Sequence, residues 1–288
     1  MARVEEFEDL RGYLFSLAYR MLGDVGEAED VVQETFLRWE QVEEDVEAPK
    51  AYLAKIATRL CIDSARSARS RRETYVGPWL PEPIPTDAAA DPATQAEQAD
   101  SLSLAFLVVL ESLSPVERAV FLLREVFEYD YPEVAEAAGV TEVNARQIAH
   151  RAKQHISGRR PRFEASAEKR LEMTLRFLAA CTAGEMDGLA ALLSDDIALY
   201  SDGGGKVRAA RRPIIGVGRV TRFLLGILDK TPEDSATSIL DVNGAPTIAI
   251  SERDHLTAIL SLDVAEGLIQ TIHIIVNPDK LERLDSTH

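Results

Sequence analysis

The sequence has little cysteine and no long apolar run. Cys61 and Cys181 are its two cysteines, and each lies in an apolar helical pattern, which is typical of buried thiols in a reducing compartment rather than of a disulfide framework. The opening residues MARVEEFEDL lack the basic start and apolar core of a secretory signal. No apolar stretch approaches the roughly 20 residues that span a bilayer. We therefore expect a soluble, cytoplasmic protein that makes no contact with a membrane.

Aromatic residues are also scarce, at 6% of the chain, which favours helices with cores of leucine, alanine and valine. Positive charge is outnumbered, because 48 acidic residues face 32 basic ones and the formal net charge is -16. This balance argues against a protein that coats nucleic acid. Local basic patches stay effective, because salt screens exposed charges beyond roughly 10 Å. The length of 288 residues favours two or three domains.

The first 50 residues predict two amphipathic helices. The apolar stripe of the first comprises Phe7, Leu10, Leu14, Leu17 and Met21, and Gly23 ends it. Asp24 then caps a second helix, with Glu27 three residues later as in a capping box. The expected buried stripe of this helix comprises Ala28, Val31, Val32, Thr35 and Phe36. Its opposite face carries Asp30, Gln33, Glu34 and Leu37.

The charge changes sign in the next segment. Residues 1–50 hold 14 acidic and 5 basic side chains, whereas residues 51–75 hold 2 acidic and 6 basic ones. Pro49 suits the first turn of a third helix. One side of this helix carries Tyr52, Lys55, Arg59, Asp63 and Arg66. Five of the thirteen prolines then fall within residues 76–100, and this density predicts an extended linker.

Residues 132–157 predict a helix-turn-helix. Ser114 and Pro115 begin a preceding helix, and Gly139 separates two further helices, 132–138 and 141–157. Their shared core would comprise Val134, Ala138, Val140, Ala145, Ile148 and Ala152. The outward side of the second helix carries Asn144, Arg146, Gln147, His150 and Arg151, which are donors suited to base edges and phosphates. The alternative is a solvated face of an ordinary helical bundle.

In the last 120 residues, helical patterns give way to strand-like segments. Helices are expected at 166–183, 186–193 and 220–228. Six segments read as strands: 197–201, 206–210, 236–242, 246–251, 256–264 and 268–276. Asn243 and Gly244 separate two of them, which is a hairpin signal. Helices followed by a mostly antiparallel sheet predict an α+β domain.

Two of these regions resemble a known family. Residues 9–39, DLRGYLFSLAYRMLGDVGEAEDVVQETFLRW, resemble the polymerase-binding region of bacterial extracytoplasmic-function (ECF) sigma factors, and residues 112–156 resemble their −35-reading domain. GPWLPEP at 77–83, DGGGK at 202–206 and NPDKL at 277–281 resemble the subgroup with a fused SnoaL-like C-terminal domain, the SigJ type. The resemblance implies two all-α sigma domains, the second with a helix-turn-helix, followed by an α+β SnoaL-like cone domain.

The resemblance also implies roles for these residues. The face with Asp30, Gln33, Glu34 and Leu37 would dock on the β′ subunit of core RNA polymerase, whose β subunit is a further expected partner. The face from Tyr52 to Arg66 would capture and melt the −10 promoter element, and residues Asn144 to Arg151 would read the −35 element. Plain solvation is the alternative for the polymerase-binding face, and a surface helix with an Arg59–Asp63 pair is the alternative for the −10 face. Arg59 stands where many members carry asparagine, and Ile148 where many carry a basic residue.

The resemblance to the SnoaL-like subgroup suggests regulation in cis. We expect three segments to meet and to fix the spacing of the DNA-reading domains: Trp79, Leu80, Pro81, Glu82 and Pro83; Asp202, Gly203, Gly204, Gly205 and Lys206; and Asn277, Pro278, Asp279 and Lys280. Simple turn chemistry is the alternative for the last two segments. A small-molecule ligand of the C-terminal domain is a further expectation.

The expected domains are residues 1–75, the linker 76–100, residues 101–160 and residues 165–288. We expect a sigma factor and not an enzyme, with no cofactor and no metal; His150 and His155, five residues apart, do not share a helix face. Two alternatives remain. A stand-alone helix-turn-helix regulator would bind DNA without polymerase. A SnoaL-like small-molecule enzyme would use acid–base candidates among Tyr200, Asp202, His255 and His273.

Overall fold

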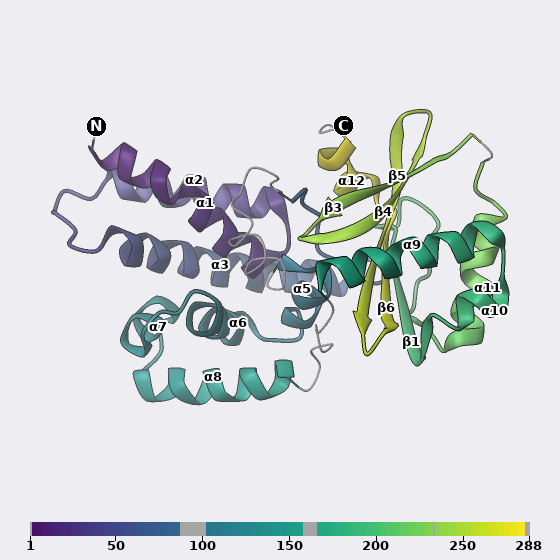
Figure 1. Ribbon diagram of the computed structural model, residues 1–288. Coiled ribbons are helices and arrows are strands. Elements are labelled where there is room, and N and C mark those ends of the chain that lie inside the picture. Colours follow the sequence, from purple (N-terminus) through teal and green to yellow (C-terminus); the bar gives the residue numbers. More distant parts are fainter. Residues whose placement is uncertain (1, 87–101, 158–165, 233, 286–288) are drawn as a thin grey trace. The chain divides into compact units, whose positions relative to one another are not determined.

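The computed structural model describes residues 2–86, 102–157, 166–232 and 234–285 (Figure 1). The described residues fall into two compact units. The first contains residues from 1–74 and 109–159, and the second contains residues from 75–108 and 160–288. Most of the expected linker and the junction with Arg159, Arg160 and Arg162 lie outside the described residues, as does His288. No helix in the described part of the chain is long and apolar enough to cross a membrane.

Three helices form the N-terminal part of the first unit, as expected. Helix α1 spans Ala2–Leu22 and stops at Gly23, whose φ of 68° closes the helix end. Helix α2 spans Val25–Glu40, and its N-cap Asp24 accepts from the Glu27 amide at 2.9 Å. Helix α3 spans Pro49–Glu73. Four of the five residues in the expected α2 stripe are buried, and Phe36 is half-buried.

The helix-turn-helix lies in the same unit. Helix α6 (Pro115–Phe121) comes first and carries a full capping box between Ser114 and Glu117. The preceding helix, α5 (Leu104–Leu110), belongs mostly to the second unit, which contains residues up to 108. A π-helical turn, η1 (Leu122–Val126), follows α6 and was not expected from the sequence. Helices α7 (Tyr131–Ala138) and α8 (Glu142–Ser157) then pack together, with Gly139 in the left-handed conformation between them. Their core is the expected one, except that Val140 is only half-buried.

The second unit is built on a six-stranded mixed sheet with the order β2-β1-β6-β5-β4-β3. Its strands are β1 (Leu193–Asp202), β2 (Ile214–Ile215), β3 (Ala236–Val242), β4 (Ala245–Glu252), β5 (His255–Ala265) and β6 (Leu268–Ile275). The β1–β6 pair is parallel, and the remaining neighbours are antiparallel. The expected α+β class is therefore confirmed.

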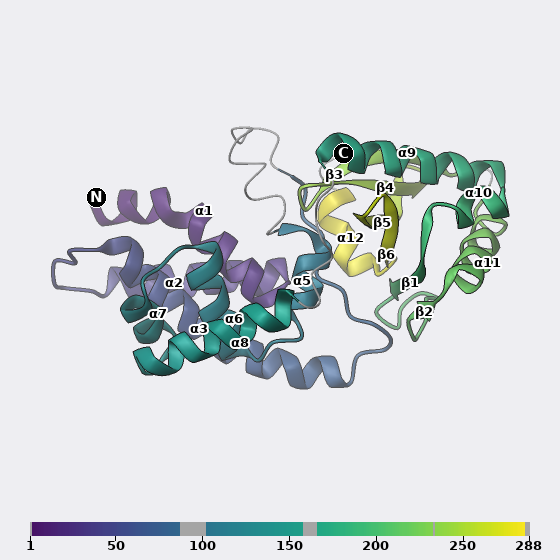
Figure 2. The same cartoon turned by 60° about the horizontal axis from the view of Figure 1, so that its bottom comes forward.

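Each face of this sheet has its own core, because successive strand residues point to opposite sides. On one face Phe177 of helix α9 (Ala167–Ala183) and Val220 of helix α11 (Val217–Leu228) pack over strand residues, together with α10 (Met186–Ala190). On the other face Leu80 and Leu281 of helix α12 (Pro278–Asp285) pack with Ile275. Figure 2 shows α9 and α12 on opposite sides of the sheet.

Several sequence-based expectations for this unit were wrong. Residues 206–210 form the end of a turn, a bend and irregular backbone instead of a strand, and Lys206 N bonds back to Gly203 O at 3.0 Å. The helix expected at 186–193 ends at Ala190, since β1 begins at Leu193. Helix α12 was not expected, although Asn277 and Pro278 form a helix-start signal: Asn277 Oδ1 accepts from the Asp279 amide at 3.2 Å.

Candidate nucleic-acid interface and the Asp202 cluster

Helix α8 presents the five residues predicted to read DNA on its exposed side. Asn144, Arg146, Gln147, His150 and Arg151 are all exposed. Beneath them Ala145, Ile148 and Ala152 are buried against the rest of the helix-turn-helix. Ile148 is only 5% exposed, so the packing of the two helices explains the apolar residue at this position. The helix therefore separates a packed side from a side rich in hydrogen-bond donors.

The donors on α8 are partly oriented by their neighbours. Arg146 pairs with Glu142 one turn away at 2.6 Å, and its guanidinium lies 4.3 Å from the centroid of the Tyr131 ring. His150 lies 3.1 Å from the side-chain amide of Gln154. An exposed pair of this kind contributes only a few tenths of a kcal/mol, so Arg146 can exchange Glu142 for another anion at little cost.

The predicted −10 face of α3 is polar and half-exposed. Tyr52 packs on Trp39 with ring centroids 5.9 Å apart, and Lys55 lies 5.9 Å from the Tyr52 centroid. Asp63 pairs with Arg66 at 3.2 Å and not with Arg59, which is exposed and donates to the backbone oxygen of Glu136. The alternative Arg59–Asp63 pair is therefore wrong for this structure.

The predicted polymerase-binding face of α2 is solvent-accessible. Asp30, Gln33 and Leu37 are exposed, and Glu34 pairs with Arg38 at 2.9 Å. Leu37 is 45% exposed, which is unusual for a large apolar side chain on a helix whose other apolar residues are mostly buried. This face thus combines negative charge with one apolar side chain, an arrangement suited to a protein partner.

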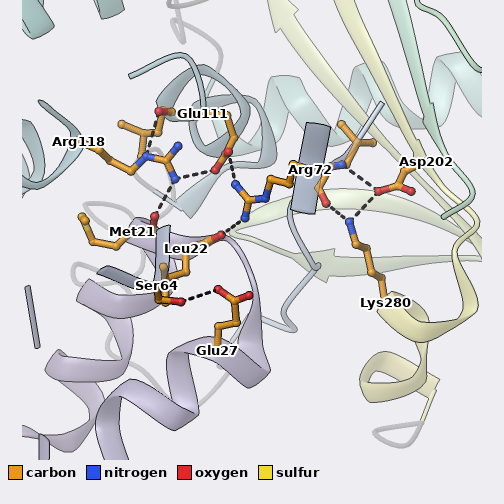
Figure 3. Close-up of polar contacts among 11 residues, drawn as sticks. Met21, Leu22, Glu27, Ser64, Arg72, Glu111, Arg118, Asp202 and Lys280 are labelled. Carbon is orange, nitrogen blue, oxygen red and sulfur yellow. Dashed lines mark hydrogen bonds and ion pairs between the residues drawn. The ribbon is translucent and has the colours of Figure 1, made fainter. Parts of the chain in front are cut away.

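The three segments expected to meet do meet, within the second unit and around Asp202 at the end of β1 (Figure 3). Asp202 is fully buried, and its Oδ2 accepts from Lys280 Nζ at 2.7 Å and from the Leu80 amide at 2.9 Å. Lys280 also donates to the Leu80 carbonyl and lies 4.4 Å from the Trp79 centroid. The buried carboxylate and ammonium therefore hold residues 79 and 80 on the α+β domain.

A tyrosine that the sequence analysis did not identify completes this cluster. Tyr75 OH donates to Asp202 Oδ1 at 2.6 Å and accepts from Asn277 Nδ2 at 3.0 Å. Burial, followed by the hydrogen bond to Asp202, raises the pKa of the Tyr75 phenol. The residue lies just before the GPWLPEP segment, and no spacing rule links it to Asp202, 127 positions later.

The glycines of DGGGK allow the segments to approach closely. Gly204 has a φ of 60°, and a Cβ atom there would lie 2.5 Å from Asn277 Nδ2. Gly205 has a φ of 74° and faces Val76. Lys206 pairs with Asp279 at 2.6 Å on the surface, and Arg283 lies 3.4 Å from buried Glu82. Pro81 and Pro83 are buried, while Pro278 begins α12.

The acid–base candidates do not converge. His255 lies at the start of β5, is exposed and pairs with Asp285. Tyr200 stacks on His273 with centroids 5.6 Å apart. His273 Nδ1 lies 3.5 Å from Asp263 Oδ2, both side chains are buried, and neither of these two atoms has a hydrogen-bond partner. Asp263 was missed by sequence analysis.

Metal binding has no support in the described ranges. Within residues 2–86, 102–157, 166–232 and 234–285, no group of three or more His, Cys, Asp or Glu side chains is arranged to hold a metal ion. Cys61 and Cys181 are free and buried. Burial raises the pKa of both thiols, which makes them poor ligands and poor nucleophiles.

Family comparisons match both halves of the first unit. The family model Sigma-70 region 2 matches residues 7–71, which contain α1 to α3 apart from the helix ends. The model Sigma-70, region 4 matches residues 103–156, which contain the helix-turn-helix. The two matches therefore cover the faces described above on α2, α3 and α8.

Similar proteins extend the match over the whole chain. The ECF RNA polymerase sigma factor SigJ of Mycobacterium tuberculosis is 37% identical, over 96% of this chain and 92% of that protein. SigI of the same species is 32% identical over 95% of this chain. The crystal structure of M. tuberculosis SigJ superimposes with a TM-score of 0.78, at 34% identity over 97% of this chain and 98% of that one. The chain therefore belongs to the family of extracytoplasmic-function RNA polymerase sigma factors and carries the fused α+β domain of the SigJ type.

Proposed function

We propose that this chain is a dissociable specificity subunit of RNA polymerase, acting in the cytoplasm. Sigma factors direct transcription initiation and are not enzymes, which rules out the reading as a SnoaL-like enzyme. In this proposal the α2 face with Asp30, Gln33, Glu34 and Leu37 binds the β′ subunit of core polymerase, and the β subunit is a further partner. Family membership also disfavours the stand-alone regulator, since a sigma factor acts with polymerase.

The two DNA-binding roles go to α3 and α8. The α3 face with Tyr52, Lys55, Arg59, Asp63 and Arg66 captures the −10 strand, because melting requires cations along a single-stranded backbone and an aromatic ring for a base. The exposed side of α8, with Asn144, Arg146, Gln147, His150 and Arg151, enters the major groove at the −35 element.

One observation carries the proposal. Every predicted base-reading side chain of α8 is exposed, while the helix is packed by Ala145, Ile148 and Ala152 on its other side. In an ordinary helical bundle, five exposed hydrogen-bond donors with no carboxylate among them would not stabilise the fold. On DNA, the same surface matches the donors and acceptors of the groove and avoids repulsion from the phosphates.

Substitutions on α8 test this directly. We expect Gln147→Ala and Arg151→Ala to reduce transcription by about 5- to 150-fold, because a lost base contact costs about 1–3 kcal/mol. The measurement is in vitro transcription with core polymerase, on templates that the intact holoenzyme has selected from genomic fragments. Arg176→Ala, an exposed arginine on α9, is the matched control and should leave transcription unchanged.

The outcome distinguishes the roles of α8. If both α8 variants transcribe as well as Arg176→Ala does, then α8 does not read the −35 element. If they fail because they no longer bind core polymerase, the helix contacts protein and not DNA. A pull-down with core polymerase separates these two results.

We further propose that the α+β domain regulates activity in cis through the Asp202 cluster. The support is the contact of the three segments: Asp202 and Lys280, both buried, hold the backbone of Leu80. The chain between the two sigma regions passes through residues 75–86, so its attachment to the α+β domain limits how that connection can move.

The polar atoms of Asp263 and His273 that lack partners are the observation that favours a small-molecule ligand of this domain.

A further inference from the structure

The first turn of α8 carries the most exposed large apolar side chain in the described ranges. Val143 is 68% exposed, whereas the next such residue, Ile215, is 54% exposed. Val143 contributes little to the fold, because most of its surface is in solvent and valine is a poorer helix former than alanine. Single exposed apolar residues are common on protein surfaces, so the position of Val143 on the helix decides what it can do.

Val143 belongs to the outermost line of side chains on α8. Successive residues of a helix are turned by about 100°, so residues three and four positions apart share a face. Val143, Gln147 and His150 have this spacing and form one line, which we call the central line. The same period places the buried residues Ala145 and Ala152 on the opposite side of the helix.

Two arginines border the central line, with Arg146 on one side and Arg151 on the other. Arg146 pairs with Glu142 at 2.6 Å, and its guanidinium lies 4.3 Å from the centroid of the Tyr131 ring. The carboxylate of the first turn is therefore engaged on the Arg146 side of the helix. When α8 lies in the major groove, the central line faces the base pairs and the two arginines lie at its borders.

The backbone that carries Val143 is held in place. Thr141 Oγ1 accepts from the Asn144 amide at 3.3 Å, and Thr141 O accepts from the Ala145 amide at 2.8 Å. Valine is branched at Cβ and strongly prefers one rotamer in a helix, so its two methyl groups are also fixed. Val143 is thus a rigid apolar surface at the N-terminal end of α8, the end that contacts base edges in helix-turn-helix proteins.

The chemistry of the central line selects particular bases. Thymine presents a C5-methyl group in the major groove, and apolar side chains contact it. The Gln147 amide offers one acceptor and two donors, which match N6 and N7 of adenine. Val143 and Gln147 are one turn apart, about 6 Å along the helix. Since base pairs rise by roughly 3.4 Å, the two target bases lie within about two base pairs of each other.

We propose that Val143 reads the methyl group of a thymine in the −35 element, and that Gln147 reads an adenine within about two base pairs of it. The inference rests on the proposed function of α8 and names two of the bases that this helix recognises. Cytosine has no methyl group at this place in the groove, so exchange of the thymine for cytosine removes the contact with Val143.

A selection experiment identifies the two bases. Holoenzyme made from the intact chain and core polymerase selects duplex fragments with a randomised −35 region, and we expect an enriched thymine near an enriched adenine. Val143→Ala should lose the preference for thymine, and Gln147→Ala the preference for adenine. Alanine is the better helix former, so Val143→Ala keeps α8 folded. Val4→Ala makes the same change at a 43% exposed residue of α1 and should keep both preferences.

A single methyl group then tests the contact. Deoxyuridine in place of the selected thymine removes only the C5-methyl group. The intact holoenzyme should bind this fragment about fourfold more weakly, the effect of one buried methyl group. Val143→Ala should bind both fragments equally, whereas Val4→Ala should keep the fourfold difference. A fourfold difference that persists in Val143→Ala would overturn the proposal, because another group would then contact the methyl.

Failure of this inference can be told apart from failure of the proposed function. If Val143→Ala and Gln147→Ala both select the same −35 sequences as the intact chain, α8 does not read these bases and the proposed function of the helix is wrong. If only Gln147→Ala changes the selected bases, α8 reads the −35 element but Val143 does not take part. A preference lost in Val143→Ala for a base other than thymine would also overturn the inference.

Discussion

Asp263 and His273 place two titratable groups in the interior of the α+β domain. Their side chains lie on adjacent strands, β5 and β6, on the sheet face that also carries Tyr200. Burial raises the pKa of Asp263 to about 8 and lowers the pKa of His273 to about 4. Between these values the folded pair holds one proton, whichever of the two residues carries it.

The pair should make stability depend on pH. An unfolded Asp–His pair loses its last proton near pH 6.5, whereas the folded pair keeps a proton up to about pH 8. The folded state thus binds more protons in this window, so stability is full below about pH 6.5 and falls as pH rises to about 8. The loss is about 2 kcal/mol, at 1.36 kcal/mol per pH unit.

Asp263→Asn should remove this loss. The variant keeps only His273, whose lowered pKa makes stability rise from about pH 4 to about pH 6.5 and then stay level. Urea unfolding of the intact chain, followed by circular dichroism at pH 6.5 and pH 8, measures the difference. Asp241→Asn changes an exposed carboxylate on β3 of the same sheet and should behave like the unsubstituted protein. An equal loss in Asp263→Asn would show that another group binds the proton.

Some site residues could be predicted from the sequence, and others could not. His273 was identified from its residue type, but Asp263 was not, because the two meet through the register of β5 on β6, with an irregularity at Asp263. Likewise Asp202, Lys280 and the Leu80 backbone were expected together from a family resemblance, whereas Tyr75 was missed. Neither a pairing set by strand register nor one across 127 positions, as between Tyr75 and Asp202, leaves a periodic signal in a single sequence.

Helices were predicted where their ends carry local signals. Asp24, Ser114 and Gly139 each act on residues within one turn, so their capping roles can be derived without tertiary structure. Helix α12 carried the same kind of signal at Asn277 and Pro278 but is only Pro278–Asp285, too short for a clear apolar period. Residues 206–210 read as a strand, yet they follow three glycines that bend the backbone away from the sheet.

The exposed face of α2 leads to a prediction about the binding of core polymerase. Leu37→Ala should weaken binding to core polymerase about tenfold, because burying an exposed leucine side chain contributes about 1.5–3 kcal/mol. Stability should change little, because Leu37 is already 45% exposed. Leu171→Ala on α9, at 42% exposure, is the control. Equilibrium binding to labelled core polymerase provides the measurement, and equal affinities for both variants would remove α2 from the interface.

At the scale of the whole molecule, an acidic chain can bind DNA because its charges are unevenly distributed. The chain carries a net charge of -16, yet the exposed side of α8 has no carboxylate between Glu142 and the end of the helix. Charge totals therefore describe bulk behaviour, such as solubility, and the distribution on single helix faces decides local binding. The α+β class followed from the pattern of helices and strands along the sequence. The contact of region 4 with region 2, such as the ion pair of Lys55 with Glu136, did not, since the two residues are 81 positions apart.

Regulation in cis predicts an effect of the Asp202 cluster on transcription. Asp202→Asn leaves Lys280 buried without a counter-charge, which costs about 3–5 kcal/mol and should release residues 75–86 from the α+β domain. Tyr75→Phe removes one hydroxyl and should give a smaller effect, about 1 kcal/mol. Lys206→Ala breaks only the exposed pair with Asp279 and serves as control.

Two readouts make this prediction decisive. Chymotrypsin should cut the released segment after Tyr75 or Trp79 in Asp202→Asn but not in Lys206→Ala. Transcription with core polymerase should change in the same order as the cutting. A segment that is cut readily while transcription stays constant would argue that the α+β domain does not regulate the sigma regions through this attachment.

The chain has two tryptophans, one in each compact unit. Trp39 is 1% exposed in the first unit, and Trp79 lies against the Lys280 ammonium in the second. Each unit thus contains one indole, and a positive charge lies near each: the Arg3 guanidinium is 5.6 Å from the Trp39 ring centroid, and the Lys280 ammonium is 4.4 Å from that of Trp79. Replacing either indole by phenylalanine leaves tryptophan emission from the other unit alone. With excitation selective for tryptophan, the melting of each half can then be recorded separately in the intact polypeptide.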